Sequence, residues 1–176
     1  IGISRFNGTT ETFDVYEFGL RAQILEQEES PCDLAVSAAL AWFDEDGESD
    51  RYNPVAALHA GRSLGEHIYL TGGFLYHGES SGITKTDTDD RHSLALTATA
   101  DLRFHPRFGI VFETSIPIDG FDDGEIMWAA GPKFSTWGHT FSLVIANSQG
   151  ISADRMAAGA PRNSDPIFGF TITRKL

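Results

Sequence analysis

The ten residues 167–176, IFGFTITRKL, carry the pattern that decides the fold of this chain. Phe168, Phe170 and Ile172 fall on one face of an extended strand, and small or polar side chains fall mainly on the other. Successive side chains of a β-strand point to opposite faces, so this alternation predicts a strand with one apolar face. Such a strand fits either a soluble sheet or a barrel whose apolar face meets lipid.

The same period of two runs through the rest of the chain, and the period of 3.6 that indicates helices is nearly absent. Most of the predicted strands are nine to fourteen residues long, which exceeds the ~5–6 residues typical of soluble proteins and matches the ~9–11 needed to cross a bilayer. About ten strands are predicted, at residues 1–6, 13–26, 33–43, 54–64, 67–78, 92–104, 108–117, 125–135, 139–147 and 166–176.

The connections between these strands alternate in length from the second strand onward. Four are tight and read QEESPC, GE, HPR and TWG. The other four are longer and polar, and read DEDGESDRYN, ESSGITKTDTDD, IDGFDDG and SQGISADRMAAGAPRNSD. An outer-membrane barrel has short periplasmic turns and longer extracellular loops. The sequence therefore predicts an all-β, antiparallel up-and-down transmembrane β-barrel with a periplasmic C-terminus and extracellular acidic loops.

One domain is expected to cover residues 1–176. The chain opens with IGISR, which reads as the middle of a strand, so we expect an upstream part and a full barrel of 12 or more strands. The last strand is expected to pair with the first one, or with a strand further upstream. The single cysteine, Cys32, excludes an internal disulfide.

The net charge of −12 disfavours a nucleic-acid partner, because phosphate binding needs a basic surface. Of the 25 acidic residues, 13 lie in three short segments that read as loops. Carboxylates separated by one residue, as in Asp44 with Asp46 and Asp87 with Asp89, are candidate Ca²⁺ ligands. A solvated acidic surface is the alternative, and no other metal or cofactor is expected.

Alternation alone does not say which row of side chains faces inward. In a membrane barrel the apolar row would face lipid, and it includes Phe18, Leu20, Leu70, Phe74, Leu96, Ile110, Phe112, Phe168, Phe170 and Ile172. The polar row would then line the lumen, with Glu17, Arg21, Gln23, Asp101, Arg103, Glu113 and Lys133. A soluble lipocalin-like barrel would reverse this arrangement, with its apolar row inside.

Two further features bear on the predicted barrel. Trp42 and Tyr76 lie near long loops, and Phe108 and Trp137 lie near tight turns, so two aromatic girdles are expected at the two membrane interfaces. The mid-strand glycines at positions 61, 72 and 73 could make space in a lumen or allow a sharp bend, but a simple packing accommodation is the preferred interpretation.

Four stretches carry a resemblance to a known family: IGISR, DVYEFGLRAQIL, HTFSLVIANSQGIS and IFGFTITRKL. With them the chain resembles the uncharacterised outer-membrane β-barrel proteins of Bacteroidota-type and related Gram-negative bacteria, a β-barrel domain of unknown function. The resemblance implies a barrel in the bacterial outer membrane, in contact with lipid and lipopolysaccharide. It implies no particular activity.

The sequence contains no Gly-x-Ser-x-Gly motif or other convergent catalytic pattern, so an enzyme is not expected. The leading hypothesis is a non-enzymatic membrane anchor or scaffold for periplasmic or surface partners, such as redox proteins. A narrow, porin-like passive channel for small solutes or ions is the alternative, and a soluble ligand-binding barrel is the least favoured. An oligomer is compatible with either membrane function.

Overall fold

The computed structural model describes residues 2–7, 12–45, 51–78, 92–120, 125–148, 156, 159–160 and 165–174. Within these ranges, the side chains of residues 2–7, 12–15, 17, 43–45, 51 and 174 are not described. The strands are β1 (Gly2–Asn7), β2 (Thr12–Leu25), β3 (Asp33–Glu45), β4 (Arg51–Leu64), β5 (Ile68–His77), β6 (Ser93–His105), β7 (Phe108–Asp119), β8 (Met127–Ser135), β9 (His139–Ala146) and β10 (Ile167–Arg174).

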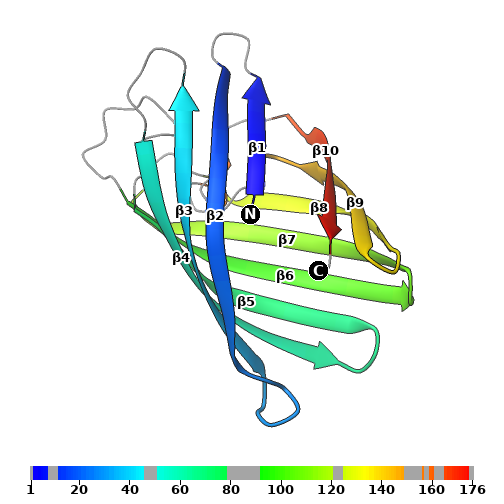
Figure 1. Ribbon diagram of the computed structural model, residues 1–176. Helices are drawn as coiled ribbons and strands as arrows, with labels where there is room; N and C mark the ends of the chain where they lie inside the picture. The colour runs from blue at the N-terminus through cyan, green and yellow to red at the C-terminus, as the bar shows by residue number, and fades with distance from the viewer. Residues whose placement is uncertain are drawn as a thin grey trace.

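All ten strands join one antiparallel sheet in which each strand pairs with the next one along the chain. This order confirms the predicted up-and-down topology. The sheet curves strongly, so that β1–β3 stand upright in the view of Figure 1 while β6 and β7 run across it. Among the described residues, no ladder joins β10 to β1, so the expected pairing of last and first strands stays a prediction. No helix in the described part is long and apolar enough to cross a membrane.

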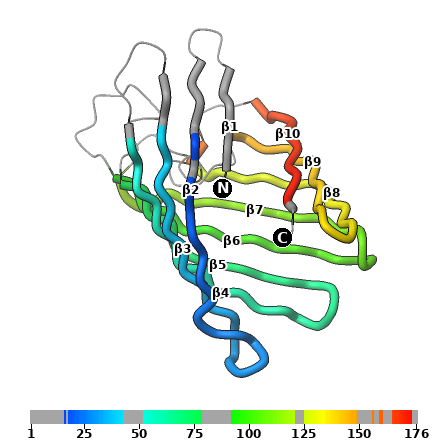
Figure 2. Tube along the Cα trace, in the orientation of Figure 1, coloured from blue at the N-terminus to red at the C-terminus, as the bar shows by residue number. Residues whose placement is uncertain are grey.

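The tight connections lie along one rim of the sheet (Figure 2). They join β2 to β3, β4 to β5, β6 to β7 and β8 to β9, as the sequence predicts. Gly65 in the β4–β5 turn has φ of 67°, a left-handed conformation that a residue with a side chain rarely adopts. The opposite ends of the strands carry the longer connections.

The two faces of the sheet differ sharply in exposure. Nine of the ten side chains named above for the apolar row have exposed fractions from 38 % for Leu96 to 85 % for Leu20, and Ile110 is half-buried. Side chains of the other row point inward, and Ala41, Ala95 and Ser115 have exposed fractions of 0 %. A lipocalin-like barrel would bury the apolar row. The outward apolar row is therefore the reverse of what the soluble alternative predicts.

Aromatic side chains gather on the outer face at both rims. Near the long connections, the ring of Trp42 lies 5.1 Å from that of Tyr16 and 6.4 Å from that of Tyr52. At the turn rim, the rings of Phe108 and Phe134 are 4.8 Å apart. These rows lie where membrane barrels carry their aromatic girdles.

Candidate functional site

The interior of the sheet is tightly packed at its long-loop end. Val55 on β4 and Leu75 on β5 form a small buried core, and Met156 from the β9–β10 connection packs against it. The hydroxyl of Ser115 on β7 donates a hydrogen bond to the carbonyl oxygen of Met156. A loop residue thus lies against the inner surface of three strands and fills space at this end.

A second contact holds the same connection in place. Ala160 forms an antiparallel bridge with Glu125, and both N–H to carbonyl hydrogen bonds are made, at 2.8 and 2.9 Å. Gly159 beside it has φ of 80°, and a Cβ there would lie 2.6 Å from Pro117. The bridge, the positive φ and the close approach together fix the loop backbone next to β7.

Toward the turn rim, the interior opens into a cavity of about 560 Å³. The cavity is bounded on its long-loop side by Met156. Its polar lining consists of charged, aromatic and hydroxyl side chains from β2 and from β4 to β10: Arg21, His59, Tyr69, Thr71, Thr99, Asp101, Glu113, Lys133, Ser142, Thr171 and Thr173.

An ion pair that skips one strand forms the cavity's most buried polar contact. Lys133 on β8 donates a hydrogen bond to the carboxylate of Asp101 on β6, and both side chains are largely buried. The strand between them, β7, has Gly109 directly beside Lys133, and a Cβ there would lie 3.4 Å from the lysine Cε. The lysine side chain thus crosses β7 at a position that has no side chain. Arg103 also donates to Asp101 at 3.4 Å.

A similar contact skips β4. The Tyr69 hydroxyl on β5 donates a hydrogen bond to Asp33 on β3 at 3.1 Å. Gly61 lies on β4 opposite Asp33, and a Cβ there would overlap the tyrosine hydroxyl. In both places, a long side chain reaches the second strand along by crossing an inward-facing glycine of the middle strand, and at Gly61 a side chain would block it.

The structure brings together most of the residues predicted to line a lumen. Arg21, Asp101, Glu113 and Lys133 line the one cavity, and Arg103 joins it through Asp101. Gln23 lies nearer the turn rim, where its amide is 3.4 Å from the Asp33 carboxylate. Glu17 lies on β2, but its side chain is outside the described set.

Several residues of the interior were not among the predicted lumen-lining set. Tyr69 and the hydroxyl residues line the cavity, and their place in the inward row of the alternation could have identified them. Asp33 begins a strand, and its partner is recognisable only once the strand register is known. Met156 carries a weak signal, since the sequence MAA is a short apolar run within a polar loop.

The mid-strand glycines do not all face the lumen. Gly61 and Gly73 belong to the inward row, where a Cβ would overlap neighbouring atoms. Gly72 instead lies on the exposed face, opposite Ala60 and Ala98. Gly72 therefore makes no space in the lumen, because its place in the alternation puts it on the outward face.

The Ca²⁺ candidates stay predictions. Asp46, Asp87 and Asp89 lie outside the described residues, and Asp44 is the second-last residue of β3, with its side chain undescribed. Within the described ranges, no group of three or more His, Cys, Asp or Glu side chains is placed to hold a metal ion.

The geometry suits a water-filled polar chamber, because several of its charged side chains contact one another and hydroxyl groups lie around them.

Comparison with known proteins gives one result for the whole chain. The family described as "Membrane bound beta barrel domain (DUF5777)", a domain of unknown function, matches residues 1–176. No curated protein and no solved structure matches the chain significantly.

Proposed function

Because the chain belongs to this family of membrane-bound β-barrel domains, we propose that it is a non-enzymatic anchor or scaffold in the bacterial outer membrane. In this proposal, the apolar row faces lipid and lipopolysaccharide, and the rims hold periplasmic or surface partners. Redox proteins are one partner class that we propose to test. The strand lengths and the outward apolar row support the membrane-spanning arrangement.

The observation that carries the proposal is the packed interior at the long-loop end. Asn53, His77, Ser93 and Ser115 have exposed fractions of at most 1 %, and Met156 packs beside this layer. A continuous water path across the membrane would need this layer to be open. A filled layer favours a role in which the barrel holds a position rather than passes solutes.

The orientation has support from the two rims. The tight turns would lie in the periplasm and the long loops outside, as in other outer-membrane barrels. Trp137, in the β8–β9 turn, is 98 % exposed, and an indole at that position suits a membrane interface.

Cysteine labelling tests this orientation in whole cells. In a Cys32→Ser background, we expect Asp119→Cys to react with an impermeant maleimide and Gly138→Cys to react only after the outer membrane is permeabilised. Both positions are suitable probes, since the Asp119 side chain is exposed and a Cβ at Gly138 meets no atom within 4 Å. Labelling of Gly138→Cys alone in intact cells would reverse the proposed orientation.

A narrow passive channel is the second candidate, and the 560 Å³ cavity with its charged lining favours it. Planar-bilayer recordings separate the two functions. The anchor proposal predicts no steady conductance for the purified protein. It also predicts that Met156→Gly, which removes the side chain beside the packed layer, raises the frequency of brief openings. Steady conductance from the unmodified protein would overturn the anchor proposal in favour of the channel.

An anchor should also retain its partner during gentle purification. Cross-linking in cells followed by extraction in mild detergent should recover a stoichiometric partner, with an exposed turn variant such as Trp137→Ser as a probe of the periplasmic rim. Recovery of the barrel alone under these conditions, from cells grown with and without respiratory substrates, would contradict the scaffold function.

A further inference from the structure

The outer face of the sheet contains a groove of about 910 Å³ across β4–β8. Two neighbouring rows of outward positions form its floor, and the strand register aligns them side by side. Leu70 on β5 is a bulky side chain within this floor, and the small residues around it are Ala60, Gly72, Ala98, Ala100, Thr114 and Ala130.

Large side chains rise on both sides of this floor. Toward the long loops, the next outward row reads Leu58, Phe74, Leu96 and Ile116 across β4–β7. Toward the tight turns, the next row reads Leu64, Ile68, Leu102 and Ile110. The groove is therefore a depression on the outer face between two rows of bulky side chains, and its walls are almost wholly apolar.

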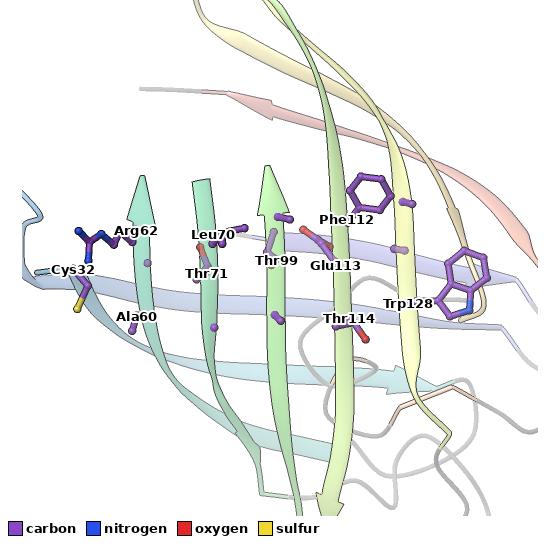
Figure 3. A pocket seen from close by; sticks show the side chains of 16 residues that line it. Cys32, Ala60, Arg62, Leu70, Thr71, Thr99, Phe112, Glu113, Thr114 and Trp128 are labelled. Atoms are coloured by element: carbon purple, nitrogen blue, oxygen red, sulfur yellow. The ribbon is translucent and has the colours of Figure 1, made fainter. Parts of the chain in front are cut away.

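The two ends of the groove differ in chemistry (Figure 3). Arg62 and Cys32 lie at the β4 end, and Phe112 and Trp128 lie at the β8 end. Arg62 is exposed, and among the described residues it has no ion-pair partner. It precedes the β4–β5 turn by three residues, so its guanidinium can reach the membrane interface at the turn rim.

The size of the groove fits one leaflet. Five strands spaced ~4.8 Å apart make it about 19 Å long. One leaflet of a bilayer with a ~30 Å hydrocarbon core is about 15 Å deep. Strands of such barrels are tilted, so a path across them climbs through the leaflet as it goes. A single acyl chain that starts at the turn rim can follow this path.

We infer that the groove binds one acyl chain of a phospholipid from the periplasmic leaflet, with the lipid phosphate held by Arg62. The apolar floor and walls suit a hydrocarbon chain, and a guanidinium binds a phosphate through paired, charge-assisted hydrogen bonds. A protein partner would find almost no hydrogen-bonding group in the groove. The inference rests on the proposed orientation, which puts the turn rim in the periplasmic leaflet.

Native mass spectrometry of the purified barrel tests this inference. The protein is delipidated in mild detergent, titrated with phosphatidylglycerol, and the fraction carrying one lipid is measured. We expect Ala98→Leu/Ala100→Leu, which fills the floor, to weaken binding at least tenfold. Arg62→Gln should weaken it about tenfold, the equivalent of one charge-assisted hydrogen bond.

Two matched variants serve as controls. Ala38→Leu makes one such alanine-to-leucine change at an exposed outward position on β3, and Arg107→Gln removes an exposed arginine from another tight turn. Both should bind lipid as the unmodified protein does. Heat-modified migration on gels verifies that every variant is folded before the titration is read.

Three outcomes would overturn the inference. The first is equal lipid binding by all variants, which would mean general coverage by bulk lipid. The second is an intact dimer that Ala98→Leu/Ala100→Leu separates, which would make a second copy the occupant. The third is loss of binding in the controls as well. The labelling experiment tests the orientation separately. If it places the turns outside the cell while the groove still binds lipid, the proposed orientation is wrong. The lipid site itself then stands, and only its assignment to the periplasmic leaflet is wrong.

Discussion

The two halves of the interior are held together by different interactions. At the long-loop end, neutral side chains pack against Met156 and exclude water. At the turn end, charged and hydroxyl groups surround a cavity and contact one another across a skipped strand. One half of the chamber thus depends on close packing and the other on a few polar contacts. Their stabilities should respond to different substitutions, which four measurements can test.

The largest effect is expected from the packed half. Leu75→Ala removes a side chain that is 5 % exposed and leaves a cavity beside Val55 and Met156. We expect a loss of about 3 kcal/mol in the free energy of unfolding, measured by tryptophan fluorescence in guanidinium with detergent micelles. Leu20→Met, at an 85 % exposed outward position, is the control and should change it by less than about 0.5 kcal/mol, because it keeps a large apolar side chain on the face proposed to meet lipid. Equal losses in the two variants would remove the distinction between the faces.

The second effect belongs to the polar half. Lys133→Met leaves the Asp101 carboxylate, whose side chain is only 13 % exposed, with Arg103 at 3.4 Å as its remaining partner. Breaking a buried pair costs about 3–5 kcal/mol, and the arginine should reduce the loss here to about 2 kcal/mol. The double variant Asp101→Asn/Lys133→Met should recover most of it, since no charge is then left buried. A double variant as unstable as the single one would show that the charge itself is unimportant.

The third effect concerns Gly109 on β7, the strand that lies between Asp101 on β6 and Lys133 on β8. A Cβ at position 109 would lie 2.6 Å from the Leu102 carbonyl oxygen and 3.4 Å from the lysine Cε. We expect Gly109→Ala to lower the free energy of unfolding by about 1–2 kcal/mol. Most of this loss should persist in a Lys133→Met background, because the closer contact is with the Leu102 carbonyl oxygen. A loss that disappears in that background would place the strain in the lysine contact instead.

The smallest effect concerns the second contact that skips a strand. Tyr69→Phe keeps the ring and removes only the hydroxyl that donates to Asp33. The expected loss is about 1 kcal/mol, the usual contribution of one hydrogen bond. Tyr52→Phe, at a 54 % exposed outward position, is the control and should behave as the unmodified protein. A larger loss in the control would argue that the ring environment matters more than the hydrogen bond.

The strands could be predicted because their signal is local. Apolar and polar side chains alternate along each strand, so the ten strands can be recognised from neighbouring residues alone. The observed bounds differ from the predicted ones by a few residues. The alternating connection lengths also depend only on neighbouring residues. For the same reason, the residues lining the cavity could be grouped as one polar row before their contacts were known.

The contacts between strands could not be predicted, because they depend on register. Nothing in the local pattern places Gly109 beside Lys133 or Gly61 opposite Asp33. The groove could not be predicted for a related reason. Alanine counts as an apolar residue in the alternation, and only the register shows that small residues of neighbouring strands lie side by side. The Met156 contact requires a loop to fold back, which strand periodicity does not report.

The two contacts that skip a strand have a consequence for how the sheet assembles. A two-stranded hairpin alone can form neither contact, because Asp33 on β3 is bound by a residue of β5 and Asp101 on β6 by a residue of β8. We therefore expect β3–β5 and β6–β8 to enter the bilayer as three-strand units. The contact made by the third strand of each unit should stabilise it. Rates of insertion into vesicles should then depend on Tyr69 and Lys133 more than on side chains that touch only their immediate neighbours.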